Sequence, residues 1–274
     1  MINSDVIVVD NKINLLVKWS TFLLLIGKGF LHFTSDQPYS YLFDNDIYGR
    51  NTFGILLILT AFLCLLERKK WTAKPTNILL VISTIIIFLH SYGTFIKAGF
   101  VPEQLIEHCL QITLPLLYLI FYNSYLITQK SLFTLLGIIV GLTFIGHGMY
   151  ALGVHYVPEN FLLMTSNSLH FTNENSKIFL FVIGILDLVF SILLFIPKYS
   201  HFSIWYLIIW GLLTSLARIY YVLNLGITTE WLTINLPNTI YRLPHGLIPI
   251  AIYLLLSKMK DEKSTNHSFK TQLM

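Results

Sequence analysis

The chain of 274 residues is 55% apolar and only 12% charged, and its mean hydropathy is +0.68. This composition is typical of membrane proteins and excludes a soluble fold of this size. The formal net charge is +4, but the basic residues flank apolar segments and form no basic domain, which argues against nucleic-acid binding.

Eight apolar stretches are long enough to cross about 30 Å of hydrocarbon as helices. The first has no small-residue cleavage site after it, so we expect it to remain as an anchor. Polar connections separate the stretches, and none is long enough for a soluble domain. The expected fold class is an all-α membrane protein with about eight transmembrane helices. In chain order they cover residues 13–33, 52–67, 76–97, 103–127, 131–154, 177–197, 202–224 and 240–257.

Lysine and arginine are concentrated on one set of connections, which predicts the orientation of the chain. Basic residues are retained on the cytoplasmic side, so both termini are expected to be cytoplasmic. Lys70 and the tail after Lys258 should then lie inside, and Asn175 outside. The residues that decide this are Lys12, Arg68, Lys69, Lys70, Lys74, Lys130, Lys198, Lys258, Lys260, Lys263 and Lys270.

A weak internal repeat predicts two parallel four-helix halves, residues 1–128 and 129–258, followed by a cytoplasmic polar tail, 259–274. An even number of helices returns the chain to its starting side, so such halves run parallel. Chance similarity between apolar helices is the alternative. The proposed equivalences are Gly27-Lys28-Gly29 with Gly146-His147-Gly148, His90 with Arg218, His108 with His245, and Pro115 with Pro249.

Six polar residues fall within about two turns of the outer ends of their helices, at one depth roughly 8 to 11 Å below the outer boundary. Charged groups in hydrocarbon cost roughly 2.5 to 3.5 kcal/mol each on insertion scales, so we expect these side chains to face one interior site. Singly, the cations could snorkel to headgroups and the histidines could bond neighbouring helices. Their shared depth favours a ligand-binding layer of Lys28, His90, His108, His147, Arg218 and His245.

Asp187 lies near the middle of its helix, out of reach of headgroups, and is added to the site. Its predicted partner is Arg218, as part of the site or as a structural ion pair, and the alternative is a neutral carboxylic acid. His32 is expected to be solvated, and Glu107 and Gln111 to form the wet end of the fourth helix. The outer connections 33–51 and 155–177 predict short interfacial segments.

Several chemistries have no motif here. The chain lacks a phosphate-binding glycine loop, a zinc-binding H-E-x-x-H pair and a G-x-S-x-G nucleophile. Cys64 and Cys109 are isolated, which argues against disulfides and dithiol redox chemistry. No metal site and no catalytic residue is assigned, although histidines on facing helices remain compatible with haem.

The two Gly-x-Gly helix ends, each leading into a loop with proline and aromatic residues, resemble those of the DoxX-like superfamily of small bacterial membrane proteins. This resemblance implies a four-helix unit, present twice, that is associated with quinone-linked oxidoreductases in the bacterial cytoplasmic membrane. The chain lacks the paired cysteines of the redox members, which puts direct thiol chemistry in doubt.

The functional hypothesis is a redox-associated component that binds a quinone between its helices near the outer face, in membrane lipid and beside partner membrane subunits. Haem ranks behind quinone as a cofactor. The alternatives are a proton-coupled small-molecule transporter and a scaffold without ligand, and the sequence does not decide whether the protein is an enzyme.

Overall fold

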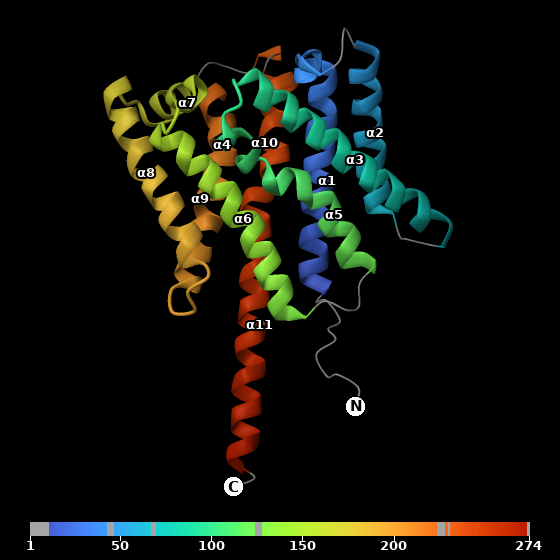
Figure 1. Ribbon diagram of the computed structural model, residues 1–274, viewed down its shortest axis with the longest axis vertical. Helices are drawn as coiled ribbons and strands as arrows, with labels where there is room; N and C mark the ends of the chain where they lie inside the picture. The colour runs from blue at the N-terminus through green and yellow to red at the C-terminus, as the bar shows by residue number, and fades with distance from the viewer. Residues whose placement is uncertain are drawn as a thin grey trace.

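The computed structural model describes residues 11–42, 47–66, 70–123, 128–223, 228–229 and 231–272, and this part of the chain is helical, without strands. Figure 1 shows the helices as one elongated bundle. The long helices are α1 (Asn11–Thr34), α2 (Ile47–Leu65), α3 (Lys70–Lys97), α5 (Cys109–Asn123), α6 (Gln129–Leu152), α8 (Asn173–Leu193), α9 (Ser200–Leu223) and α11 (Pro244–Gln272). The short elements are η1 (Pro38–Tyr41), α4 (Pro102–Glu107), α7 (Glu159–Leu169), η2 (Trp231–Asn235) and α10 (Leu236–Arg242).

Seven helical segments in the described ranges are long and apolar enough to cross a membrane, so the chain is a polytopic helical membrane protein. The spans that contain α4 and α10 continue into α5 and α11. The apolar helix Gly49–Leu65 is shorter, and the expected count of eight depends on it. The spans are Asn11–Thr34, Thr72–Lys97, Pro102–Phe121, Gln129–Leu152, Asn173–Leu193, Ser200–Tyr220 and Trp231–Asp261.

The stretch predicted at 103–127 corresponds to the span Pro102–Phe121, and residues 124–127 lie outside the described ranges. Within this span the helix breaks at His108, which has φ −86° and ψ 1°. The cause is a contact from another helix. The amide of Leu110 donates to Oγ1 of Thr143 in α6 at 3.0 Å. A second break separates α10 from α11 beside Pro244, whose nitrogen carries no hydrogen for the helix ladder.

Four helices, α1, α5, α6 and α11, pack together at the centre of the bundle. Each contributes side chains that are fully withdrawn from solvent, such as Leu24, Leu114, Leu136 and Ile248. In Figure 1, α2 and α3 lie on one side of this centre and α8 and α9 on the other. The polar site is therefore bounded by helices that the core holds in place.

Two glycines allow helix backbones to touch. A Cβ at Gly27 in α1 would lie 2.8 Å from the amide nitrogen of Tyr241 in α10. A Cβ at Gly146 in α6 would lie 2.7 Å from Cα of Glu107 in α4. Side chains do not fit at such distances, so glycine is needed at both positions.

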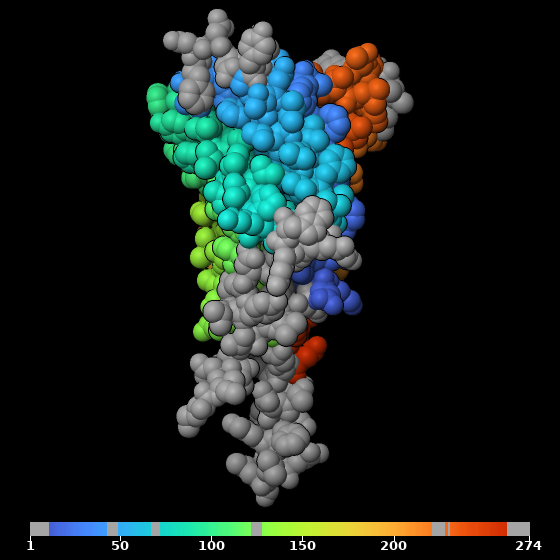
Figure 2. All heavy atoms as spheres, turned by 90° about the vertical axis from the view of Figure 1, so that its right-hand side faces the viewer, coloured from blue at the N-terminus to red at the C-terminus, as the bar shows by residue number. Residues whose placement is uncertain are grey.

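The outward faces of the bundle are apolar. Ile55, Phe62, Ile78 and Phe88 are exposed large side chains on α2 and α3, the two helices that cover much of the upper part of the face in Figure 2. Such surfaces are typical of contact with lipid, because soluble proteins rarely expose large apolar patches to water. The same holds for Phe181 and its neighbours on α8.

The start of α1 and the end of α11 lie at the same end of the molecule, and η1 and α7 lie at the opposite end (Figure 1). Helix α7 occupies the connection where a short segment was predicted. The segment predicted as a polar tail, 259–274, is helical as far as Gln272, where α11 ends, and its boundary at 259 stays a prediction.

Candidate functional site

The six residues predicted for the polar layer come from different segments and lie in the interior. Lys28 in α1, His108 at the α4–α5 break and His245 in α11 are buried, with Lys28 only 2% exposed. The other three, His90 in α3, His147 in α6 and Arg218 in α9, are partly buried.

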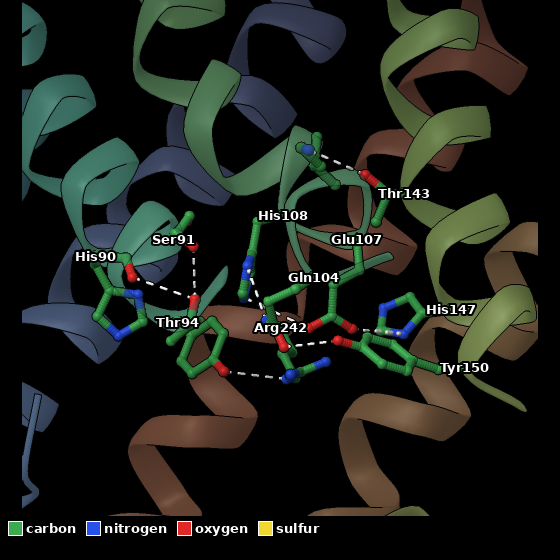
Figure 3. A network of polar contacts seen from close by, with 12 residues as sticks. His90, Ser91, Thr94, Gln104, Glu107, His108, Thr143, His147, Tyr150 and Arg242 are labelled. Atoms are coloured by element: carbon green, nitrogen blue, oxygen red, sulfur yellow. Dashed lines mark hydrogen bonds and ion pairs between the residues drawn. The ribbon is translucent and has the colours of Figure 1, made fainter. Parts of the chain in front are cut away.

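Glu107, at the end of α4, connects these groups (Figure 3). Its Oε1 lies 3.6 Å from Nε2 of His108, and its Oε2 lies 3.4 Å from Nδ1 of His147. The amide of Gln104 donates to Oε1 at 3.2 Å, and the Tyr150 hydroxyl donates to the Gln104 carbonyl at 2.8 Å. A buried carboxylate thus joins α4 to α6, with its orientation fixed by two neutral side chains.

The imidazole rings extend this contact in both directions. The ring of His147 lies 5.5 Å from that of His245, between centroids, and the ring of His90 lies 6.3 Å from that of His108. The order across the bundle is therefore His90, His108, Glu107, His147 and His245. The structure brings together residues from both predicted halves.

Three cations surround this row. Nζ of Lys28 lies 4.3 Å from the centre of the Tyr241 ring, and Nε of Arg242 donates to the Tyr241 hydroxyl at 3.2 Å. Arg218 is the third, and the main electrostatic partners that all three share are the Tyr241 phenol and the Glu107 carboxyl group. Within the described residues none of them has an acidic oxygen within 4 Å. The layer therefore carries an excess of positive charge.

The prediction that His32 is solvated is wrong, because η1 folds against α3 and covers it. His32 is 1% exposed. Its Nδ1 donates to the Lys28 carbonyl at 2.7 Å, so Nε2 accepts from the Tyr39 hydroxyl, also at 2.7 Å. Burial raises the pKa of the Tyr39 phenol, which keeps the proton that it donates.

The predicted pairing of Asp187 with Arg218 is also wrong. Asp187 is buried, and its Oδ1 accepts a hydrogen bond of 2.6 Å from the Tyr206 hydroxyl. Trp210 is on the same helix as Tyr206, one turn further along. Tyr206 in α9 lies beside Asp187 in α8, whereas Arg218 lies about two turns beyond Trp210 along α9.

A cavity of about 550 Å³ lies beside the layer, between α6, α7, α8, α9 and the α10–α11 break. Aromatic and aliphatic side chains form most of its wall, among them Phe144, Phe161, Phe179 and Trp210. Its polar lining includes Asp187, His147, Arg218, Arg242 and His245. Four of the seven predicted site residues therefore line one cavity. Lys28, His90 and His108 lie outside it and belong to the adjoining network.

The centre of the site differs from the one predicted from the sequence. Glu107 is predicted to lie at the wet end of a helix but is buried, and Arg242 is not among the predicted site residues. Tyr241 was not considered. Two spacings in the sequence indicate these residues. Arg242 lies one helical turn before His245, and Glu107 lies one turn before Gln111.

No group of three or more histidine, cysteine, aspartate or glutamate side chains in the described ranges is arranged to hold a metal ion. Comparison of the chain with protein-family models, curated proteins and solved structures gives no match. The chemistry of the site must therefore be argued from its own residues.

Proposed function

We propose that this membrane protein binds a quinone, or a comparable flat amphiphile, in the cavity beside the polar layer. The observation that carries this proposal is one cavity with N–H donors at its polar side and aromatic rings along its walls. Pockets for small ligands are mostly apolar, with a few polar groups that set orientation.

The residues suit the parts of such a ligand. Arg218 and Arg242 offer N–H groups to carbonyl oxygens, and arginine is always charged. Phe144 and Phe161 provide faces and edges for a ring. A volume of about 550 Å³ lies within the range typical of ligand pockets. Haem remains the lower-ranked cofactor, and a Soret band in the purified protein would reverse that order.

The binding prediction uses Trp210, which lies in the cavity wall. A decyl-chain benzoquinone should quench its fluorescence saturably in purified protein, and Trp210→Phe should remove that part of the signal. Ala217→Phe fills the cavity and should weaken binding at least tenfold, whereas Ala98→Phe, outside the cavity, should not. Quenching that is linear in quinone and equal in all variants would contradict the proposal.

The DoxX-like resemblance and the two-half organisation belong to this proposal. The glycine contacts support both, because equivalent glycines make equivalent contacts: Gly27 packs against Tyr241 in the same way as Gly146 packs against Glu107. The spacing from Glu107 to Tyr241 equals that from Pro115 to Pro249. In this register Gln111, and not His108, is the equivalent of His245, one helical turn from the pairing predicted from the sequence.

The proposed location is the bacterial cytoplasmic membrane, with both termini inside and the polar layer toward the outer face. Asn175 and Lys198 are exposed and flank α8 at its opposite ends, so they test this orientation. With Cys64 and Cys109 replaced by alanine, an impermeant maleimide added to intact cells should label a cysteine at 175 and not one at 198. The reverse pattern would place the layer at the inner face.

A proton-coupled transporter is the second candidate, because titratable groups run from Tyr39 and His32 through His90 to the row that ends in the cavity. The centroids of the His32 and His90 rings are 6.2 Å apart. Buried ionisable groups in a membrane are typical of proton pathways. Proton-coupled uptake that Asp187→Asn abolishes would favour this class over quinone binding.

A further inference from the structure

His245 has an assignable tautomer. Its Nδ1 lies 2.8 Å from the carbonyl oxygen of Arg242. A carbonyl oxygen only accepts hydrogen bonds, so Nδ1 carries the hydrogen. In a neutral ring the other nitrogen, Nε2, is then an acceptor with a free lone pair.

This acceptor is buried and has no hydrogen-bond partner in the described part of the chain. His245 is 3% exposed and lines the cavity. A second proton on the ring would place a further charge in a buried site that Arg242 and Arg218 also line. A buried acceptor without a partner is rare in native proteins and calls for an explanation, such as a ligand.

Arg218 supplies the complementary group. Its Nε is also buried without a partner, and it lines the same cavity. The cavity therefore combines an acceptor without a partner, His245 Nε2, with a donor without a partner, Arg218 Nε, and Arg242 lines the same cavity. A hydroxyl group satisfies both, because its hydrogen donates while its oxygen accepts.

We propose that the cavity selects the hydroxylated, reduced ligand, a hydroquinone, over the corresponding quinone. The hydroxyl donates to His245 Nε2, and its oxygen accepts from an arginine N–H. This inference rests on the proposed quinone-binding function. A quinone carbonyl has no hydrogen to give, so it would leave Nε2 unpaired, which is worth roughly tenfold in affinity.

The test compares three ligands on the purified protein: a decyl-chain hydroquinone kept reduced under nitrogen, its quinone, and its dimethyl ether. The hydroquinone should bind roughly tenfold more tightly than the other two, with affinities measured by equilibrium dialysis. The ether retains the ring and the oxygens of the hydroquinone but lacks the hydroxyl hydrogens. It therefore tests the donated hydrogen bond in the unaltered protein.

His245→Phe should bring the three affinities within about twofold of one another. His201→Phe is the matched control, because His201 lies outside the cavity and packs on Tyr253, with 5.8 Å between ring centroids. It should keep the preference. If the Phe variant fails to fold, His245→Gln takes its place. The glutamine amide must use its N–H to reach the Arg242 carbonyl, which leaves its own carbonyl oxygen as the acceptor for the ligand. This variant should therefore keep a weakened preference for the hydroquinone.

The outcomes separate the two proposals. Failure of all three ligands to bind the wild-type protein would overturn quinone binding itself. Equal or tighter binding of the quinone would overturn the selectivity and leave the cavity as a quinone site. A preference that survives in His245→Phe would remove His245 as the acceptor.

Discussion

Replacement of Glu107 by leucine is expected to lower the free energy of unfolding by about 3–5 kcal/mol, the usual cost of removing one partner from a buried charge network. Glu107 is the acid that offsets Lys28, Arg218 and Arg242, and it contacts two histidines. Without it, three cations would face one another in a low-dielectric interior. Glu107→Gln keeps hydrogen bonds and should cost less.

Denaturant titration in detergent micelles measures this effect. Glu159→Leu is the control, because Glu159 is exposed at the start of α7 and should change stability by less than about 0.5 kcal/mol. Removing a cation at the same time, in Glu107→Leu with Arg242→Leu, should recover part of the loss, since the charges interact. A stable Glu107→Leu protein with wild-type unfolding would show that the layer is not held by this carboxylate.

The helices could be predicted from the sequence because each apolar run is a local property of the chain. The stretch predicted at 131–154 is α6, Gln129–Leu152, and the stretch predicted at 76–97 lies within α3. The count of residues to each helix end predicts one common depth for the polar residues, and that depth stays a prediction. Within the structure, the rings of His147 and His245 lie side by side, and Lys28 is buried.

The remainder depends on contacts between distant segments. The break at His108 comes with a hydrogen bond from Leu110 to Thr143 on another helix, which no local pattern reports. His32 is buried only because η1 returns over it. The cavity is lined by α7, a short helix at the end of the bundle opposite the start of α1. Such tertiary effects decide which polar residues pair and which face a ligand.

Gly146→Ala is expected to destabilise the protein by about 1–3 kcal/mol and to weaken ligand binding. The added methyl group would overlap the backbone nitrogen and Cα of Glu107, and a backbone cannot move aside as a flexible side chain can. Helices α4 and α6 would have to separate, which would lengthen the 3.4 Å contact between Glu107 and His147.

Gly141→Ala on the same helix is a matched control. A Cβ there would lie 3.7 Å from its nearest neighbours, which is an ordinary contact. Alanine also has the better helix propensity, by up to about 1 kcal/mol, so this variant should be as stable as the wild type or slightly more stable. Thermal unfolding of both variants in detergent isolates the close approach of α4 to α6 from the general effect of losing a glycine. If Gly146→Ala unfolds at the same temperature as Gly141→Ala, the backbones of α4 and α6 do not touch at Glu107. The close approach of these two helices would then not position the Glu107 carboxylate.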